Sequence, residues 1–62
     1  MERVQWEVTK ESWDKIMALG LTKWQPGEMG TGTFFIETPD ELIKVKEGDW
    51  VNKTDEGNFI VQ

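Results

Sequence analysis

The sequence predicts an α+β fold, in which one helix packs on a small antiparallel β-meander or β-barrel. One segment repeats its apolar residues with the period of a helix. Several short segments are rich in β-branched and aromatic residues, and turn-forming residues separate them. A chain of 62 residues is long enough for one domain only. We therefore expect a single domain over residues 1–62 with the element order β-α-β-β-β-β.

The first predicted strand covers residues 3–8. Its side chains alternate, so that Val4, Trp6 and Val8 share one face and polar residues share the other. Alternation with period two is typical of a strand that buries one face. We expect these three apolar side chains to point into the core.

The helix is predicted over residues 10–20. Thr9 stands at the position of an N-terminal cap, and Gly20 suits the left-handed residue that ends a helix. Ser12 and Lys15 fall on the polar face, which we expect to be turned to water. The apolar face is expected to form one buried stripe that consists of Trp13, Ile16, Met17 and Gly20.

The rest of the chain predicts one loop and four strands. Three glycines and a proline within residues 25–33 exclude regular structure there, so this segment is predicted as a loop. Turns are predicted at residues 39–41, 47–49 and 54–58, where Pro, Gly, Asp and Asn occur. The strands are expected at residues 33–38, 42–46, 50–53 and 59–62.

The four tryptophans and three phenylalanines supply the largest apolar side chains of the expected core. Trp6 and Trp13 belong to the periodic patterns, and we expect Trp50 to join them by lying opposite Phe59 in the last hairpin. Trp24 belongs to no pattern, because it stands between the end of the helix and the glycine-rich loop. It either closes the core as a lid or serves as an anchor for a partner.

The composition argues against catalysis. The chain has no cysteine and no histidine, so it lacks a disulfide framework, a Cys/His zinc site and a histidine base. Ser12 is the only serine and has no base to activate it, and the glycine-rich loop lacks the Lys-Ser/Thr pair of a phosphate-binding loop. No apolar run is long enough to cross a membrane. We expect no enzyme activity, no catalytic residue, no cofactor and no metal site.

Charge indicates the kind of partner. Twelve acidic and seven basic residues give a net charge of −5, and the basic residues are scattered along the chain. Such a surface repels phosphate backbones, so we expect neither direct nucleic-acid binding nor a membrane partner. Seven of the twelve carboxylates fall within residues 37–56, in the predicted C-terminal hairpins. The candidate interface combines turn carboxylates with apolar side chains near the loop: Trp24, Met29, Asp40, Glu41, Asp55 and Glu56.

Short motifs occur at fixed spacing in the predicted strands and turns: Gln5-Trp6, Thr38, the run 45–53 with Gly48-Asp49-Trp50, and Lys53…Gly57-x-Phe59. These motifs resemble those of a group of small uncharacterised phage and prophage proteins. The resemblance covers the first strand and most of residues 34–61, but not residues 20–33. Those proteins usually continue into a Pro-rich tail beyond the position of Gln62. The resemblance implies a phage origin and a cytoplasmic setting in the host cell, and it supplies no catalytic residue.

These observations predict a small non-catalytic binding protein that sequesters or inhibits a host component, such as a defence protein or a nucleic-acid-handling protein. Its acidic and aromatic surface would occupy a basic groove of that host protein. Two alternatives stay open. Several copies could form a homo-oligomer that encloses a small ligand such as a nucleotide, or the chain could be a structural component of the phage.

Overall fold

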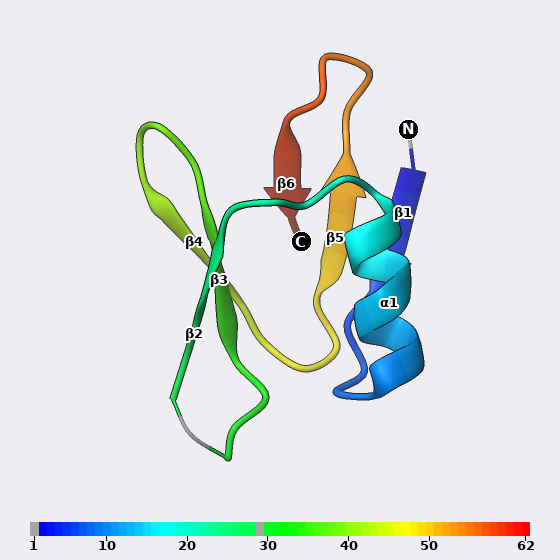
Figure 1. Cartoon of the computed structure of the whole chain (residues 1–62), viewed down its shortest axis with the longest axis vertical. Helices are drawn as coiled ribbons and strands as arrows, with labels where there is room; N and C mark the ends of the chain where they lie inside the picture. Colours follow the sequence, from blue (N-terminus) through cyan, green and yellow to red (C-terminus); the bar gives the residue numbers. More distant parts are fainter. Residues whose placement is uncertain (1, 29) are drawn as a thin grey trace.

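The protein folds into two three-stranded antiparallel sheets and one short helix (Figure 1). The computed structural model describes residues 2–28 and 30–62. Along the chain the elements are β1 (Glu2–Gln5), α1 (Lys10–Ala18), β2 (Trp24–Pro26), β3 (Phe34–Glu37), β4 (Leu42–Val45), β5 (Trp50–Lys53) and β6 (Phe59–Val61). The prediction of an α+β fold is confirmed.

The two sheets do not close into a barrel, so the barrel alternative is wrong. Sheet A has the strand order β1-β5-β6, and sheet B has the order β2-β3-β4. β4 and β6 approach each other where the sheets meet, but no backbone hydrogen bond joins them in the part of the chain that the structure describes. α1 follows β1 in the chain and packs against it (Figure 1).

The helix begins and ends where the sequence indicates. The Thr9 hydroxyl accepts a hydrogen bond from the backbone amide of Ser12 at 3.1 Å, which satisfies one free amide of the first turn. Gly20 follows the helix with φ +103° and donates its amide to the carbonyl of Met17 at 2.9 Å.

Two ion pairs line the exposed side of α1. The Lys10 ammonium lies 2.8 Å from the Asp14 carboxylate, and the Lys15 ammonium lies 3.2 Å from the Glu11 carboxylate. The hydrogen bond and the charge of Asp14 raise the pKa of Lys10 above its ordinary value. Because all four side chains are exposed, both pairs contribute little to stability.

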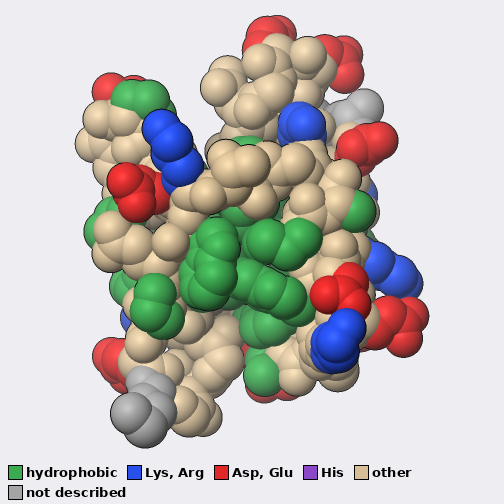
Figure 2. All heavy atoms as spheres, in the orientation of Figure 1, with side chains coloured by type: hydrophobic (Ala, Val, Ile, Leu, Met, Phe, Trp, Pro, Cys, Tyr) green, Lys and Arg blue, Asp and Glu red, His purple; other side chains and the backbone are tan. Residues whose placement is uncertain are grey.

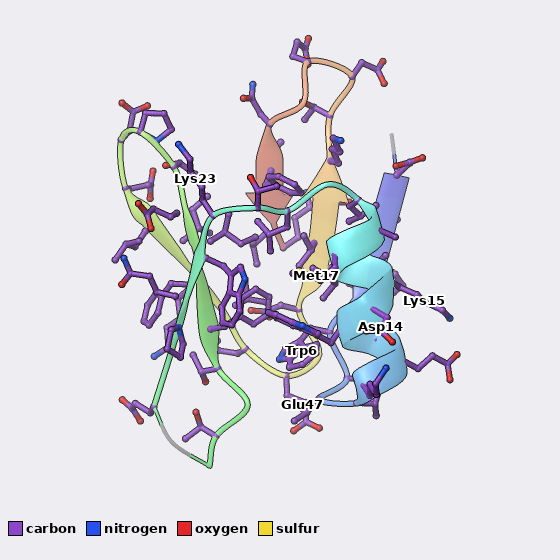
Figure 3. The ribbon with its side chains drawn as sticks, in the orientation of Figure 1. Trp6, Asp14, Lys15, Met17, Lys23 and Glu47 are labelled. Atoms are coloured by element: carbon purple, nitrogen blue, oxygen red, sulfur yellow. The ribbon has the colours of Figure 1, made fainter. Side chains whose placement is uncertain are left out.

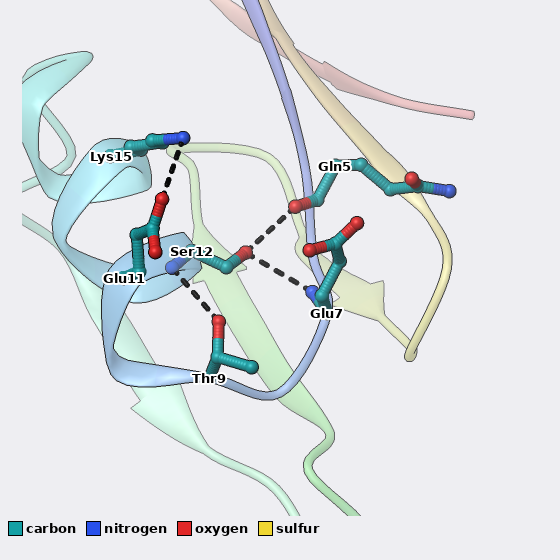
Figure 4. Close-up of polar contacts among 6 residues, drawn as sticks. All are labelled: Gln5, Glu7, Thr9, Glu11, Ser12 and Lys15. Atoms are coloured by element: carbon teal, nitrogen blue, oxygen red, sulfur yellow. Dashed lines mark hydrogen bonds and ion pairs between the residues drawn. The ribbon is translucent and has the colours of Figure 1, made fainter.

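Ser12 departs from its predicted place on the water-facing side of the helix. It is only 5% exposed, because its hydroxyl joins α1 to the strand that precedes it (Figure 4). The Oγ atom donates to the carbonyl of Gln5 at 2.7 Å and accepts from the amide of Glu7 at 3.1 Å. The hydroxyl thus bonds to the carbonyl of the last residue of β1 and to an amide two residues beyond it.

Val8 also departs from the prediction, because β1 ends at Gln5 and does not extend to residue 8. Val8 is 43% exposed and has φ +55°, a left-handed conformation that is unfavourable for a β-branched residue. The backbone turns here to bring the chain from β1 into the helix, so the alternating pattern ends before Val8 reaches the core.

The core lies between the two sheets and α1. An aromatic cluster occupies one part of it, in which Trp6 and Trp13 each meet the ring of Phe34 edge to face at centroid distances of 5.4 and 5.0 Å. The largest fully buried side chains are Ile16, Ile36, Val45 and Val51. Three members of the predicted helix stripe, Trp13, Ile16 and Met17, pack in or against the core, whereas the fourth, Gly20, is exposed.

The segment predicted as a loop contains a strand at its start. β2 pairs with β3 in antiparallel register, with Trp24 opposite Ile36 and Pro26 opposite Phe34. Proline is tolerated here because β2 is an edge strand and the missing amide would point away from β3. The element order is therefore β-α-β-β-β-β-β, with one strand more than predicted.

Trp50 does not lie opposite Phe59. In sheet A Trp50 pairs with Gln5, and Phe59 pairs with Lys53. Val51 points into the core, so Trp50 points to the other face of the sheet, where the guanidinium of Arg3 lies 4.0 Å from the centre of its ring. The predicted core contact is replaced by a cation–π contact on the outside.

Candidate protein-binding cleft

The turns of two hairpins flank a cleft at one end of the molecule. The turn between β3 and β4 forms one wall, and the turn between β5 and β6 forms the other (Figures 1 and 2). The cleft has a volume of about 500 Å³. Its walls come from segments that are far apart in the sequence, and it contains both polar and apolar side chains.

Hydrogen bonds to a threonine side chain fix the first wall. The hydroxyl of Thr38 donates to the carbonyl of Glu41 at 2.8 Å and accepts from the amide of Glu41 at 3.0 Å. The backbone of Thr38 also donates to the carbonyl of Glu41 at 3.0 Å. These bonds involve only the backbone of Glu41, so the side chains of Asp40 and Glu41 line the cleft and stay exposed.

The second wall repeats this arrangement with another threonine. Thr54 accepts the amide of Asn58 on its hydroxyl at 3.1 Å and donates its own amide to the carbonyl of Asn58 at 2.9 Å. Gly57 adopts φ +86° within the turn, a left-handed conformation that favours glycine. Asp55 and Glu56 form the exposed tip of this wall.

The floor of the cleft is apolar. Leu21 is buried there, and Ile43 of β4 and Phe59 of β6 are half-buried. Figure 1 shows that β4 and β6 both start at their turns and run in the same direction, and that they diverge toward the turns. The cleft opens where the two strands separate, so part of the apolar core is accessible from outside.

The charge around the cleft is mostly negative. Glu37, Asp40 and Glu41 are among the lining residues, and Lys23 is the one lysine among the described residues that line it. Figure 3 shows Lys23 beside the β3–β4 hairpin. The carboxylate of Glu37 accepts a hydrogen bond from the side-chain amide of Gln25 at 3.2 Å. Four of the predicted interface residues, two from each turn, are thus brought to the same end of the molecule.

The other two carboxylates of the C-terminal hairpins lie elsewhere. Glu47 is at the end of the molecule opposite the cleft (Figure 3). Asp49 is in the same turn, and its carboxylate accepts the amide of Lys46 at 2.9 Å. The seven carboxylates that the sequence groups together are therefore divided between two ends, and only those near residues 37–41 and 55–56 surround the cleft.

Trp24 belongs to a separate apolar surface. Its ring meets that of Trp13 edge to face at 4.7 Å, yet it remains 40% exposed. Met17 lies one helical turn after Trp13 and points toward the same region (Figure 3). Figure 2 shows hydrophobic side chains gathered at the centre of this face, below the cleft. Trp24 thus covers the core and presents apolar surface at once, while Met29 lies outside the described residues.

Comparison with known proteins identifies no relative. No protein-family model, curated protein or solved structure matches the chain. Within residues 2–28 and 30–62, no three acidic side chains are grouped so that they could hold a metal ion. The one helix of the described chain is too short to cross a membrane.

Proposed function

We propose that the protein is a non-catalytic binding protein that captures a basic partner protein in the acidic cleft. In the phage setting that the sequence motifs suggest, the partner is a host component, such as a defence protein or a nucleic-acid-handling protein. Capture would sequester or inhibit that component.

The observation that carries this proposal is the position of four carboxylates on two walls. Asp40 and Glu41 line one side of the cleft, and Asp55 and Glu56 are exposed in the turn that forms the other side. Two walls of the same charge favour a positively charged group between them, and the apolar floor adds contact area that water does not compete for.

Charge also explains how such a protein would inhibit. A basic surface that receives a nucleic-acid backbone is attracted to a negatively charged protein over several ångströms, which raises the association rate at low salt. A partner held in this way would have its basic residues covered, and it would lose access to phosphates.

Affinity capture from host lysate tests the proposal. Tagged wild-type protein is compared with the double variant Asp40→Lys/Glu41→Lys, which reverses the charge of one wall. Because the turn is fixed by backbone atoms of Glu41 and by Thr38, we expect the variant to keep its fold. The matched control is Glu47→Lys, an exposed reversal at the opposite end.

We expect wild type and the Glu47 variant to retain the same basic protein, and the wall variant to release it. Retention should weaken as the salt concentration rises, because exposed charges are screened. Equal retention by all three proteins would show that the cleft is not the binding surface. Sedimentation of the purified protein separates this function from the oligomeric alternative, which requires an assembly larger than a monomer.

A further inference from the structure

We propose that the segment bound in the cleft is extended, carries an apolar side chain between lysines or arginines, and pairs as a strand with the free edge of β6. This inference rests on the proposed function and adds how the partner is recognised. The charge of the cleft alone would accept many basic surfaces, and backbone pairing with β6 would restrict the partner to an extended segment.

The hydrogen bonds of β6 show which of its backbone groups are free. Trp50 and Gln62 exchange two backbone hydrogen bonds at 2.8 and 3.0 Å, and Thr54 bonds with Asn58 at the other end of the pair. Bonded and non-bonded residues alternate along an antiparallel strand, so Ile60 also points its backbone groups toward β5. The amide and carbonyl of Phe59 therefore point away from β5, toward the cleft side.

β4 does not use this edge. It is the nearest strand of sheet B, but no hydrogen bond joins it to β6 within the described residues. Since β4 runs in the same direction as β6 and diverges from it toward the turns, the space widens beside Phe59 (Figure 1). An exposed strand edge beside a groove is the arrangement by which proteins receive an added strand.

The floor determines what one side chain of the added strand must be. Ile43 and Phe59 present half-buried apolar surface to the cleft, with buried Leu21 beneath. A strand lying on this edge turns every second side chain to one face, so an apolar residue that faces the floor would bury surface on both partners. A wholly polar segment would leave the floor without a contact.

The walls determine the neighbouring side chains. Asp40 and Glu41 face the cleft on one side, and the tip with Glu56 stands on the other, with Lys23 as the cation nearby. Long lysine and arginine side chains can reach carboxylates at the rim while the backbone stays at the edge of β6. Charge complementarity therefore selects a basic segment and disfavours an acidic one.

Three synthetic peptides test the inference with the isotope-labelled full chain. The first is acetyl-Lys-Val-Lys-Leu-Lys-Val-Lys-amide, which alternates basic and apolar residues. The second is identical except that the leucine and the following lysine carry N-methyl groups, which remove one donor from each edge of the strand. The third replaces all three apolar residues by glycine and keeps the charge.

We expect the first peptide to bind, with its largest amide chemical-shift changes at Phe59 and in the two turns. Both altered peptides should bind at least about tenfold more weakly, since one loses strand pairing and the other loses apolar contact. The variant Asp40→Lys/Glu41→Lys should bind the first peptide about tenfold more weakly, and Glu47→Lys within about twofold of wild type.

Equal binding of the N-methylated peptide would overturn strand pairing, and equal binding of the glycine peptide would overturn the role of the floor. Absence of binding, or shift changes confined to other surfaces, would overturn the inference as a whole. If the lysate experiment still shows capture through the wall residues, the proposed function stands although this inference fails. If the variant Asp40→Lys/Glu41→Lys captures lysate proteins as well as wild type does, the proposed function fails. The peptide titration still decides whether β6 accepts a strand.

Discussion

Replacing Ser12 by alanine tests whether one hydroxyl holds the helix to sheet A. The Ser12 hydroxyl donates to the carbonyl of Gln5 and accepts from the amide of Glu7, at 2.7 and 3.1 Å. Ser12→Ala removes both bonds in a place that is only 5% exposed, so water replaces them poorly. The variant should therefore be less stable, although alanine is the better helix former.

The expected magnitude follows from these two bonds. Each contributes about 1 kcal/mol to the free energy of unfolding, and their loss costs about 2 kcal/mol. The higher helix propensity of alanine returns about 0.5 kcal/mol, which leaves a net loss of about 1.5 kcal/mol. For a domain of this size such a loss lowers the melting temperature by roughly 6–12 °C.

Urea unfolding and amide hydrogen exchange measure the effect. Besides the lower stability, we expect faster exchange of the Glu7 amide in Ser12→Ala, because its acceptor is lost. The control is Lys15→Ala on the exposed side of the same helix, which should change the free energy of unfolding by less than about 0.5 kcal/mol. A Ser12 variant with wild-type stability and unchanged Glu7 exchange would refute the reasoning.

Three further predictions concern stability. Val8→Asn should raise the free energy of unfolding by about 1 kcal/mol, because asparagine tolerates the left-handed φ of +55° better than valine; no gain in urea unfolding would show that Val8 packing outweighs its strain. Trp24→Ala should lower it by about 2 kcal/mol through lost contact with the ring of Trp13, and an unchanged value would mean that Trp24 does not cover the core. The raised pKa of Lys10 makes a small contribution to the stability of the fold, which is complete below the ordinary pKa of 10.5 and is lost as pH rises past the folded-state pKa. Asp14→Asn should remove this pH dependence of stability. If the pH dependence persists in that variant, it belongs to another group.

Much of the fold follows from local patterns. The helix was predictable because Thr9 and Gly20 mark its ends and the apolar stripe fixes its buried side. The hairpins were predictable because turn residues separate short apolar runs. β2 was missed because Pro26 and the following glycines indicate a loop, whereas the partner strand β3 supplies the hydrogen bonds that make residues 24–26 a strand.

Other errors have the same cause, which is that a strand or helix pattern contains no information about its neighbours. The polar character of serine predicts a water-facing Ser12, but its hydroxyl bonds to the carbonyl of Gln5 in the preceding strand. Asn52 is buried for a similar reason, since its side-chain amide donates to the carbonyls of Trp50 and Ile60 at 3.3 and 3.2 Å. The sequence predicts Trp50 in the core because it does not contain the register of β5 against β1.

The cleft is likewise predictable from the sequence only in part. Turn chemistry predicts its acidic rim residues, since Asp40, Glu41 and Glu56 stand in segments that favour turns. Their placement on two walls depends on the divergence of β4 and β6, which is a property of how the sheets pack. The floor residues Ile43 and Phe59 were expected simply as apolar strand positions, and no local signal distinguishes them from other core residues.

The strand order of the two sheets has a consequence for how the chain folds. Sheet B is formed from consecutive strands, so each of its pairs closes a short loop and can form early. Sheet A instead pairs Glu2 with Lys53, so β1 has no strand partner until all the chain between them has been synthesised. During synthesis α1 would therefore be present before the strand pair that it packs against is complete. We expect sheet A to assemble last, and the cleft between the two turns to appear only in that final step.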